Sequence, residues 1–132
     1  MAAVLGSRIE PMRDLRPEED DPLPEASDGR LMEYGLCHVD VEPDPLFDGL
    51  PARLDVAQFH NLMLSTLGAD LVNLGQSDEC PVQALRHRRR PLYGVQFHPE
   101  YATDEYPHGR KVLENFFRIA RASSSDNRRM SE

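Results

Sequence analysis

A strand-like segment that ends in His-Pro-Glu constrains this chain more than any other feature of its sequence. Residues 92–97 predict a β-strand, and Pro99 must end it because proline fixes its own φ and lacks a backbone N–H. Successive side chains of an extended segment alternate faces, so His98 and Glu100 should point the same way. The carboxylate can then bond one imidazole N–H and leave the other ring nitrogen as a base. The segment therefore indicates the histidine and the acid of a nucleophile–His–acid triad.

Further strands and one helix follow from the spacing of apolar residues. Runs rich in β-branched and aromatic residues predict strands at residues 31–41, 54–59, 71–76 and 80–86, in addition to 92–97. Apolar residues at spacings of three and four predict a helix over 109–120 that packs on the sheet, through Val112, Leu113, Phe116, Phe117 and Ala120. Between and beyond these elements the sequence predicts an acidic surface loop at 13–30, a turn-rich loop at 43–51 and a disordered tail at 121–132.

The His-Pro-Glu segment also resembles a known family. Tyr-Gly-Val-Gln-Phe-His-Pro-Glu at residues 93–100 is similar to the terminal triad segment of class I glutamine amidotransferases. The likeness extends over residues 1–120, most clearly at 33–35, 39–41, 44–51, 59–61, 77–85 and 109–120. It implies an α/β fold, with a partial open mixed or parallel sheet and flanking helices, in which the N-terminal strands of the flavodoxin-like amidotransferase fold are lacking.

The resemblance also implies a function and a set of site residues. These domains free ammonia from the side-chain amide of glutamine, with His98 as proton carrier and Glu100 as its supporting acid. Phe59-His60-Asn61 resembles the strand end beside the glutamine, so His60 and Asn61 are candidate substrate-binding residues. A buried, hydrogen-bonded strand histidine is the alternative for His60. No cofactor is implied, and the ammonia would pass to a separate synthase domain or subunit.

The expected nucleophile is the part of the pattern that the chain does not show. In the family it is the cysteine of Gly-x-Cys-x-Gly-x-Gln, followed by an alanine-rich helix, and Met1–Gly6 resembles the tail of that helix. Cys37 within a predicted strand and Cys80 before Pro81 lack the helix N-terminus that lowers a thiol pKa. We therefore expect the C-terminal part of a glutaminase domain that is inactive alone. A non-catalytic amidotransferase-like binding protein is the alternative, and a γ-glutamyl hydrolase of the same fold is a more remote one.

Composition excludes several other classes of protein. The chain has 132 residues, the length of about one domain, and no apolar run near the roughly 20 residues of a membrane-spanning helix. Two cysteines and no signal-peptide pattern suit a cytoplasmic protein. A net charge of −8 argues against nucleic acid or a membrane surface as a partner. The histidines and cysteines lack the paired spacings of zinc sites, so no metal is expected.

Overall fold

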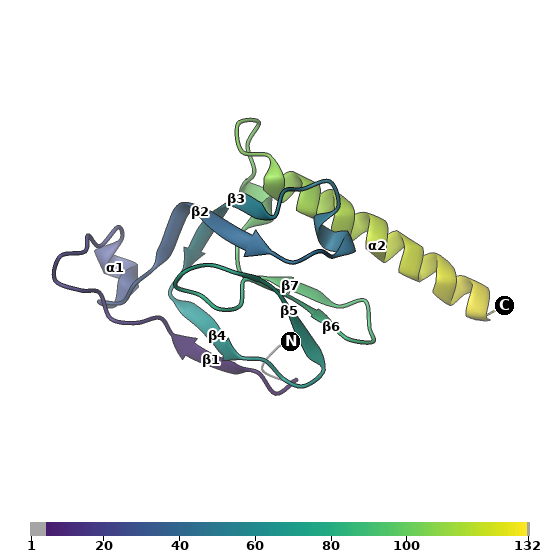
Figure 1. The fold of residues 1–132 in the computed structure, drawn as a ribbon, viewed down its shortest axis with the longest axis horizontal. Helices are drawn as coiled ribbons and strands as arrows, with labels where there is room; N and C mark the ends of the chain where they lie inside the picture. Colours follow the sequence, from purple (N-terminus) through teal and green to yellow (C-terminus); the bar gives the residue numbers. More distant parts are fainter. Residues whose placement is uncertain (1–4, 132) are drawn as a thin grey trace.

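The computed structural model describes residues 5–131, and side chains as far as Ser124. Within residues 5–131, seven strands precede one long C-terminal helix, which lies across the sheet and extends beyond it (Figure 1). In chain order the elements are β1 (Arg8–Pro11), α1 (Pro24–Ser27), β2 (Glu33–Val41), the 3₁₀ helix η1 (Pro45–Phe47), β3 (Arg53–His60), β4 (Leu62–Thr66), β5 (Leu71–Gln76), β6 (Ala84–His87), β7 (Tyr93–Val95), the 3₁₀ helix η2 (Pro99–Tyr101) and α2 (His108–Ser131).

The main sheet has five strands in the order β3-β2-β5-β6-β7, and β1 pairs with β4 in a separate two-stranded sheet. The α/β class is confirmed, but every strand pair among the described residues is antiparallel. A parallel pair needs a crossover of a dozen or more residues, most often a helix. No helix lies between β3 and β7, and the segments that join β5 to β6 and β6 to β7 are too short for such a crossover, so these neighbours are antiparallel.

The sheet curls until its two ends meet. Beyond β7, the His98 backbone N–H donates to the Ala57 carbonyl at 2.9 Å, which joins the end of the last strand to β3. Two residues earlier, the Gln96 N–H donates to the Gln83 carbonyl at 2.8 Å and extends the pairing with the β6 segment. His98 is thereby held by backbone bonds at the seam where the first and last strands of the sheet come together.

Helix α2 covers one face of this curled sheet. Val112 is buried against core residues of the sheet, and Phe116 and Ile119 are packed beside it. Asn115 fixes the helix further, because its Nδ2 donates to the backbone oxygens of Leu46 and Asp48 at 2.9 and 3.0 Å. The sequence placed Phe117 in the packed stripe, and this was wrong, because Phe117 is 55% exposed and Ile119 takes the inward position.

Several predicted boundaries differ from the structure. The backbone of α2 is helical to Ser131, past the predicted end at Ala120. The predicted strand at 80–86 begins only at Ala84, because Ser77 and Cys80 exchange backbone bonds in a tight turn. Strands β1 and β4 were not predicted. Of the predicted helix tail at 1–6, residues 1–4 lie outside the described residues, and Leu5 and Gly6 form a turn.

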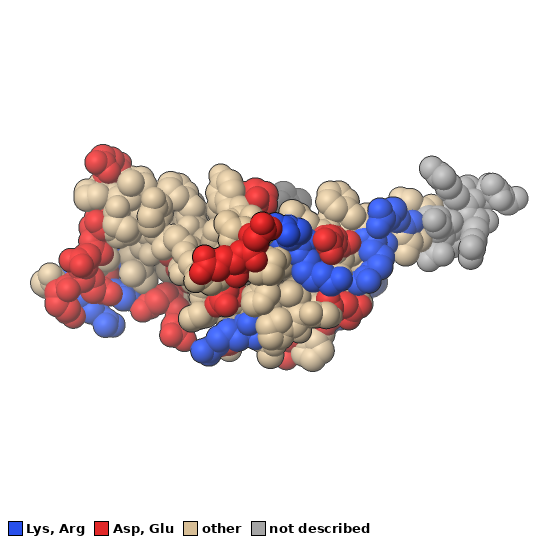
Figure 2. Space-filling model, turned by 90° about the horizontal axis from the view of Figure 1, so that it is seen from above, with Lys and Arg blue, Asp and Glu red and all other residues tan. Residues whose placement is uncertain are grey.

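The acidic surface loop at 13–30 contains one short helix, α1, and is tied down at its start. Arg13 bonds both Glu19, at 2.7 and 2.8 Å, and Glu79 of the turn before β6, at 3.0 and 3.1 Å. The guanidinium lowers the pKa of Glu19 to about 2. Figure 2 shows acidic side chains at the end of the molecule where this loop lies and basic ones along α2. Acidic side chains also lie over the middle of the molecule in this view. No helix within residues 5–131 combines the length and the apolarity needed to cross a membrane.

Candidate functional site

The His98–Glu100 pair forms in the structure, in the turn that follows β7. His98 Nδ1 lies 2.7 Å from Glu100 Oε1. The predicted contact is confirmed, but its cause is a turn and not strand alternation. Pro99–Tyr101 is a 3₁₀ helix, in which the Tyr101 N–H donates to the His98 carbonyl at 3.2 Å. The reversal of the chain brings the carboxylate back to the imidazole from two residues away.

Close packing against α2 holds this turn in place. Pro99 is buried, and Gly109 in the first turn of α2 lies directly against its backbone. A Cβ at Gly109 would lie 2.5 Å from the Pro99 oxygen and 2.8 Å from its Cα. Because these are backbone atoms, any side chain at Gly109 would displace the turn that holds the pair.

The pair leaves one imidazole nitrogen open. The hydrogen bond from His98 lowers the pKa of Glu100, so the carboxylate is ionised at neutral pH and accepts the Nδ1 proton. The neutral ring then has its lone pair on Nε2, to which no described residue forms a hydrogen bond. The His98 side chain is 35% exposed. Chemically, this is a base with one nitrogen fixed and the other accessible.

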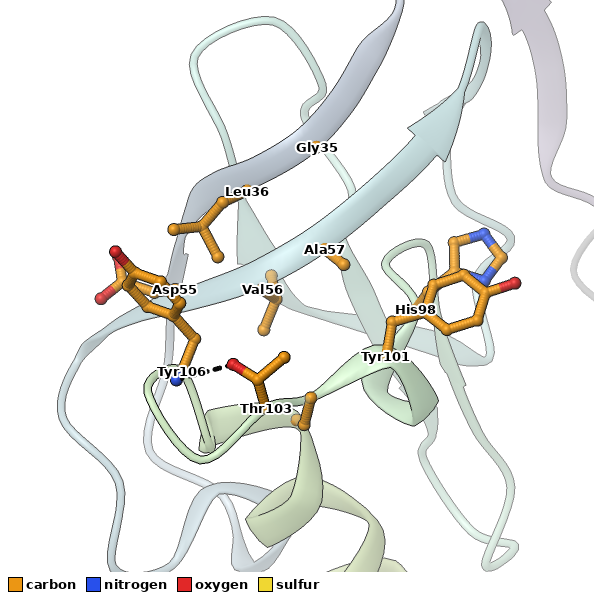
Figure 3. A pocket seen from close by; sticks show the side chains of 11 residues that line it. Gly35, Leu36, Asp55, Val56, Ala57, His98, Tyr101, Thr103 and Tyr106 are labelled. Atoms are coloured by element: carbon orange, nitrogen blue, oxygen red, sulfur yellow. Dashed lines mark hydrogen bonds between the residues drawn. The ribbon is translucent and has the colours of Figure 1, made fainter.

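A hollow of about 240 Å³ lies beside His98. Strands β2 and β3 form one wall through small and aliphatic residues, and η2 with the loop before α2 forms the other. His98 and Tyr101 stand together at one end of the hollow, and Leu36 and Asp55 lie at the other (Figure 3). The loop is braced by the Tyr106 N–H, which donates to Thr103 Oγ1 at 3.1 Å. The open imidazole thus stands at a mainly apolar cavity.

His60 and Asn61 do not line this hollow. His60 is buried, with Nδ1 2.8 Å from the Leu62 carbonyl oxygen and Nε2 2.9 Å from Glu33 Oε1. It is thus the buried, hydrogen-bonded strand histidine of the alternative interpretation. Asn61 Nδ2 donates to the carbonyls of Ala26 and Ser27 at 3.3 Å each and attaches α1 to the strand end. The structure brings neither residue together with His98.

Glu33 was not among the predicted site residues, yet it is the centre of the hydrogen-bonded polar group around His60. Its Oε1 accepts from Gln83 Nε2 at 2.5 Å and its Oε2 accepts from Ser77 Oγ at 2.7 Å. Gln58 adds a further buried amide, donating to Gln83 Oε1 at 2.9 Å. A signal for this group was present in the sequence, because Gln83 is a lone polar residue within the apolar run Pro-Val-Gln-Ala-Leu. A polar side chain that is buried with such a run needs a hydrogen-bond partner elsewhere in the fold.

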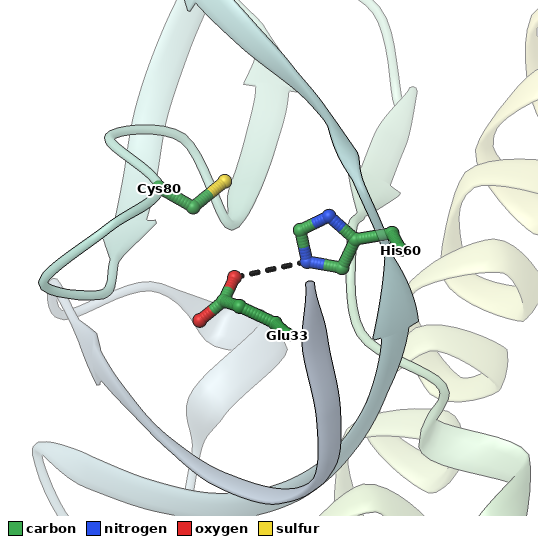
Figure 4. Close-up of side chains that lie close together, drawn as sticks. All are labelled: Glu33, His60 and Cys80. Atoms are coloured by element: carbon green, nitrogen blue, oxygen red, sulfur yellow. Dashed lines mark hydrogen bonds and ion pairs between the residues drawn. The ribbon is translucent and has the colours of Figure 1, made fainter. Parts of the chain in front are cut away.

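Glu33, His60 and Cys80 also present three possible metal ligands, with atoms within 4.8 Å of one another (Figure 4). Their atoms are already engaged, because the Glu33 oxygens bond His60, Gln83 and Ser77, and Cys80 Sγ donates to the Val82 carbonyl at 3.5 Å. Burial, followed by the negative charge of Glu33, raises the pKa of Cys80 to about 11. The cluster therefore works as a hydrogen-bonded core element with a protonated thiol.

Neither cysteine is placed to react beside His98. Cys37 lines a different hollow, next to Glu33 and His38, and burial raises its pKa. Cys80 is fully buried within the cluster around Glu33. Both environments favour the thiol over the nucleophilic thiolate.

The fold and the His98 turn define a class of protein. The model of the family "Glutamine amidotransferase class-I" matches residues 25–120, and the chain belongs to this family. A solved structure of similar fold, a putative GMP synthase subunit protein from Thermoplasma acidophilum, aligns with a TM-score of 0.75 at 26% identity, covering 96% of this chain and 55% of that one.

Within this family, the chain is similar in sequence to curated GMP synthase proteins. The chain is 39% identical over 92 residues to a GMP synthase [glutamine-hydrolyzing] subunit of Pyrococcus abyssi, covering 69% of this chain and 48% of the relative. It is 40% identical over 84 residues to GMP synthase [glutamine-hydrolyzing] of Thermosipho melanesiensis, covering 64% of this chain and 16% of the relative. The chain thus spans about half the length of the Pyrococcus abyssi relative it matches.

Proposed function

We propose that this chain provides the histidine and the acid of a glutaminase site that releases ammonia from the side-chain amide of glutamine. The observation that carries the proposal is the His98–Glu100 contact of 2.7 Å, made by a histidine that lines a cavity and whose Nε2 bonds no described residue. Membership of the class-I amidotransferase family supports it, as do relatives whose names state glutamine hydrolysis.

In this mechanism a cysteine thiolate attacks the amide carbon of glutamine to give a glutamyl thioester. His98 Nε2 accepts the thiol proton and then gives it to the departing nitrogen, which leaves as ammonia. Glu100 holds Nδ1–H, fixes the tautomer and stabilises the imidazolium. Water then hydrolyses the thioester with His98 as base. The ammonia passes to a synthase domain or subunit.

The attacking thiol in this proposal is neither Cys37 nor Cys80, because both have raised pKa values and line other parts of the molecule. It has to come from a segment with the family's Gly-x-Cys-x-Gly-x-Gln pattern. The experiment adds such a segment, the portion of the Pyrococcus abyssi protein that this chain does not match, as a separate polypeptide or a fusion.

Ammonia release from glutamine is then measured for the chain alone and with the added segment. We expect background release alone and activity when the segment is present, lost by about six orders of magnitude in His98→Ala. His38→Ala is the matched control, because His38 also pairs with a carboxylate, Asp55, at 2.6 Å but outside the turn. Glutaminase activity of the unassisted chain with labelling of Cys37 or Cys80 would contradict the assignment.

A non-catalytic binding protein is the second candidate, favoured by the exposed apolar side chains next to the hollow. Tyr34 and Phe59 are cross-strand partners with ring centroids 5.7 Å apart. Both residues are 48% exposed, and Leu36 is 49% exposed. Exposed aromatic clusters of this kind are typical of protein interfaces. Tight binding of the added segment with no ammonia release would favour this candidate.

A further inference from the structure

Tyr101 makes a contact with His98 that the triad does not require. The two rings are stacked, with centroids 5.2 Å apart and an angle of 18° between their planes (Figure 3). Tyr101 is the last residue of η2, so the same short turn delivers Glu100 and Tyr101 to one imidazole. The tyrosine is 63% exposed, and burial therefore explains little of its placement.

The two contacts restrain the imidazole in different directions. Glu100 bonds Nδ1 in the plane of the ring, and a single hydrogen bond of this kind leaves the ring able to rock about the N···O line. Tyr101 covers one face and opposes that rotation. Together they determine both the position of Nδ1 and the plane of the ring, and hence where Nε2 points.

The stacked tyrosine ring also affects the electrostatics of His98. The π-face of an aromatic ring is negative and attracts a cation placed over it, whereas a neutral imidazole gains only the weaker stacking interaction. In the proposed reaction His98 alternates between the neutral and the protonated form. A tyrosine face beside it therefore stabilises the protonated form, in the same sense as Glu100.

We propose that Tyr101 is a positioning residue for His98, which fixes the plane of the imidazole through its ring face and favours the imidazolium. The functional meaning rests on the proposed glutaminase role of His98. The contact is made by the ring and not by the hydroxyl, so phenylalanine should replace tyrosine and an aliphatic side chain should not.

NMR titration of the histidine side chains in the 132-residue chain tests this without any enzyme assay. For Tyr101→Leu we expect the midpoint of the His98 titration to fall by about half a pH unit, the size of an exposed cation–π contact. Tyr101→Phe should keep the original midpoint. Tyr106→Leu removes the other exposed tyrosine of the same hollow and should leave His98 unchanged, and the His38 signal is an internal control.

Two outcomes would overturn the inference: a His98 midpoint in Tyr101→Leu that equals the parent's, or a Tyr101→Phe midpoint that moves as far as that of Tyr101→Leu. Tyr101→Gln gives a second non-aromatic variant, because an exposed position tolerates a polar side chain. The titration and the ammonia assay fail independently. If the titration behaves as expected and no ammonia is released with the added segment, the glutaminase role fails and the positioning contact stands.

Discussion

Two histidine–glutamate pairs in this chain make nearly the same contact and differ in everything around it. His98–Glu100 joins residues two apart at 2.7 Å, with side chains 35% and 51% exposed. His60–Glu33 joins residues 27 apart at 2.9 Å, with side chains 7% and 10% exposed. In the buried pair both ring nitrogens face oxygens, whereas His98 keeps Nε2 open. Whether a histidine can act as a base depends on its second nitrogen more than on its carboxylate.

The difference also extends to the partners of each glutamate. Glu33 accepts hydrogen bonds from His60, Gln83 and Ser77, and so holds β2, β3 and the segment before β6 together. Glu100 bonds His98 across a surface turn. The first pair is therefore expected to determine stability, and the second to determine reactivity.

The largest expected effect is the loss of Glu33. Glu33→Ala leaves the buried His60 and Gln83 and the half-buried Ser77 without their shared acceptor, and breaking a buried pair in this way costs about 3–5 kcal/mol. Glu100→Ala, the matched change in the exposed pair, should cost about 0–1 kcal/mol. Urea unfolding followed by circular dichroism measures both, and Glu33→Gln, which retains one acceptor, covers the case in which the alanine variant does not fold. Equal losses of unfolding free energy in Glu33→Ala and Glu100→Ala would contradict the assignment of stability to the buried pair alone.

The second effect concerns Cys80, which reports how closed the buried cluster is. A pKa raised from 9.0 to about 11 leaves about one thiolate in a thousand at pH 8, so alkylation in the native state should be very slow and rise about tenfold per pH unit. Mass spectrometry after iodoacetamide treatment, with urea-unfolded protein as the control, measures it. Rapid native labelling of Cys80 at pH 8 would show that the cluster is open.

The same shift has a consequence for folding at high pH. The folded state holds the Cys80 proton more tightly than the unfolded state does, so this contribution to stability is fully present below pH 9. It is lost as the pH rises through about 11. In Cys80→Ala, the free energy of unfolding should therefore fall less steeply between pH 9 and about pH 11 than it does in the parent chain.

The smallest of the three effects is expected from a backbone change that should disturb the His98–Glu100 pair and leave the His60–Glu33 pair intact. Gly109→Ala places a Cβ 2.5 Å from the Pro99 oxygen, so η2 must shift, at a cost of about 1–3 kcal/mol. NMR should show changed His98 signals and unchanged His60 signals. Gly29→Ala is a control at a glycine with no atom within 4 Å of the added Cβ, although its φ of +73° adds strain of its own. A perturbed His60 with an intact His98 would contradict this account of the turn.

Much of the secondary structure follows from local patterns. The predicted strand at 71–76 coincides with β5, and 54–59 lies within β3, where buried and exposed residues alternate. That alternation places Gln58 and His60 on the same face as the core residues Leu54 and Val56, so the burial of His60 was implicit in the strand pattern. Resemblance to the family's substrate-binding segment made His60 a candidate substrate-binding residue as well.

Other features depend on contacts that no local pattern contains. Strands β1 and β4 form by pairing with each other across some fifty residues, and Arg8–Pro11 is mostly exposed and ends in proline. The antiparallel order and the bridge from His98 to Ala57 likewise join distant segments. Their free energy comes from burial and backbone pairing that exist only once the sheet has curled.

The sequence by itself predicted the contact between His98 and Glu100, because the two residues are only two apart and Pro99 between them ends the strand. It also indicated the family and the apolar face of α2 apart from Phe117. Tertiary structure decided which histidine is open, because the β2–β3 register places Glu33 opposite His60 and the fold then buries both. It also decided that Gly109 lies against Pro99, since that close backbone approach depends on α2 packing against the turn.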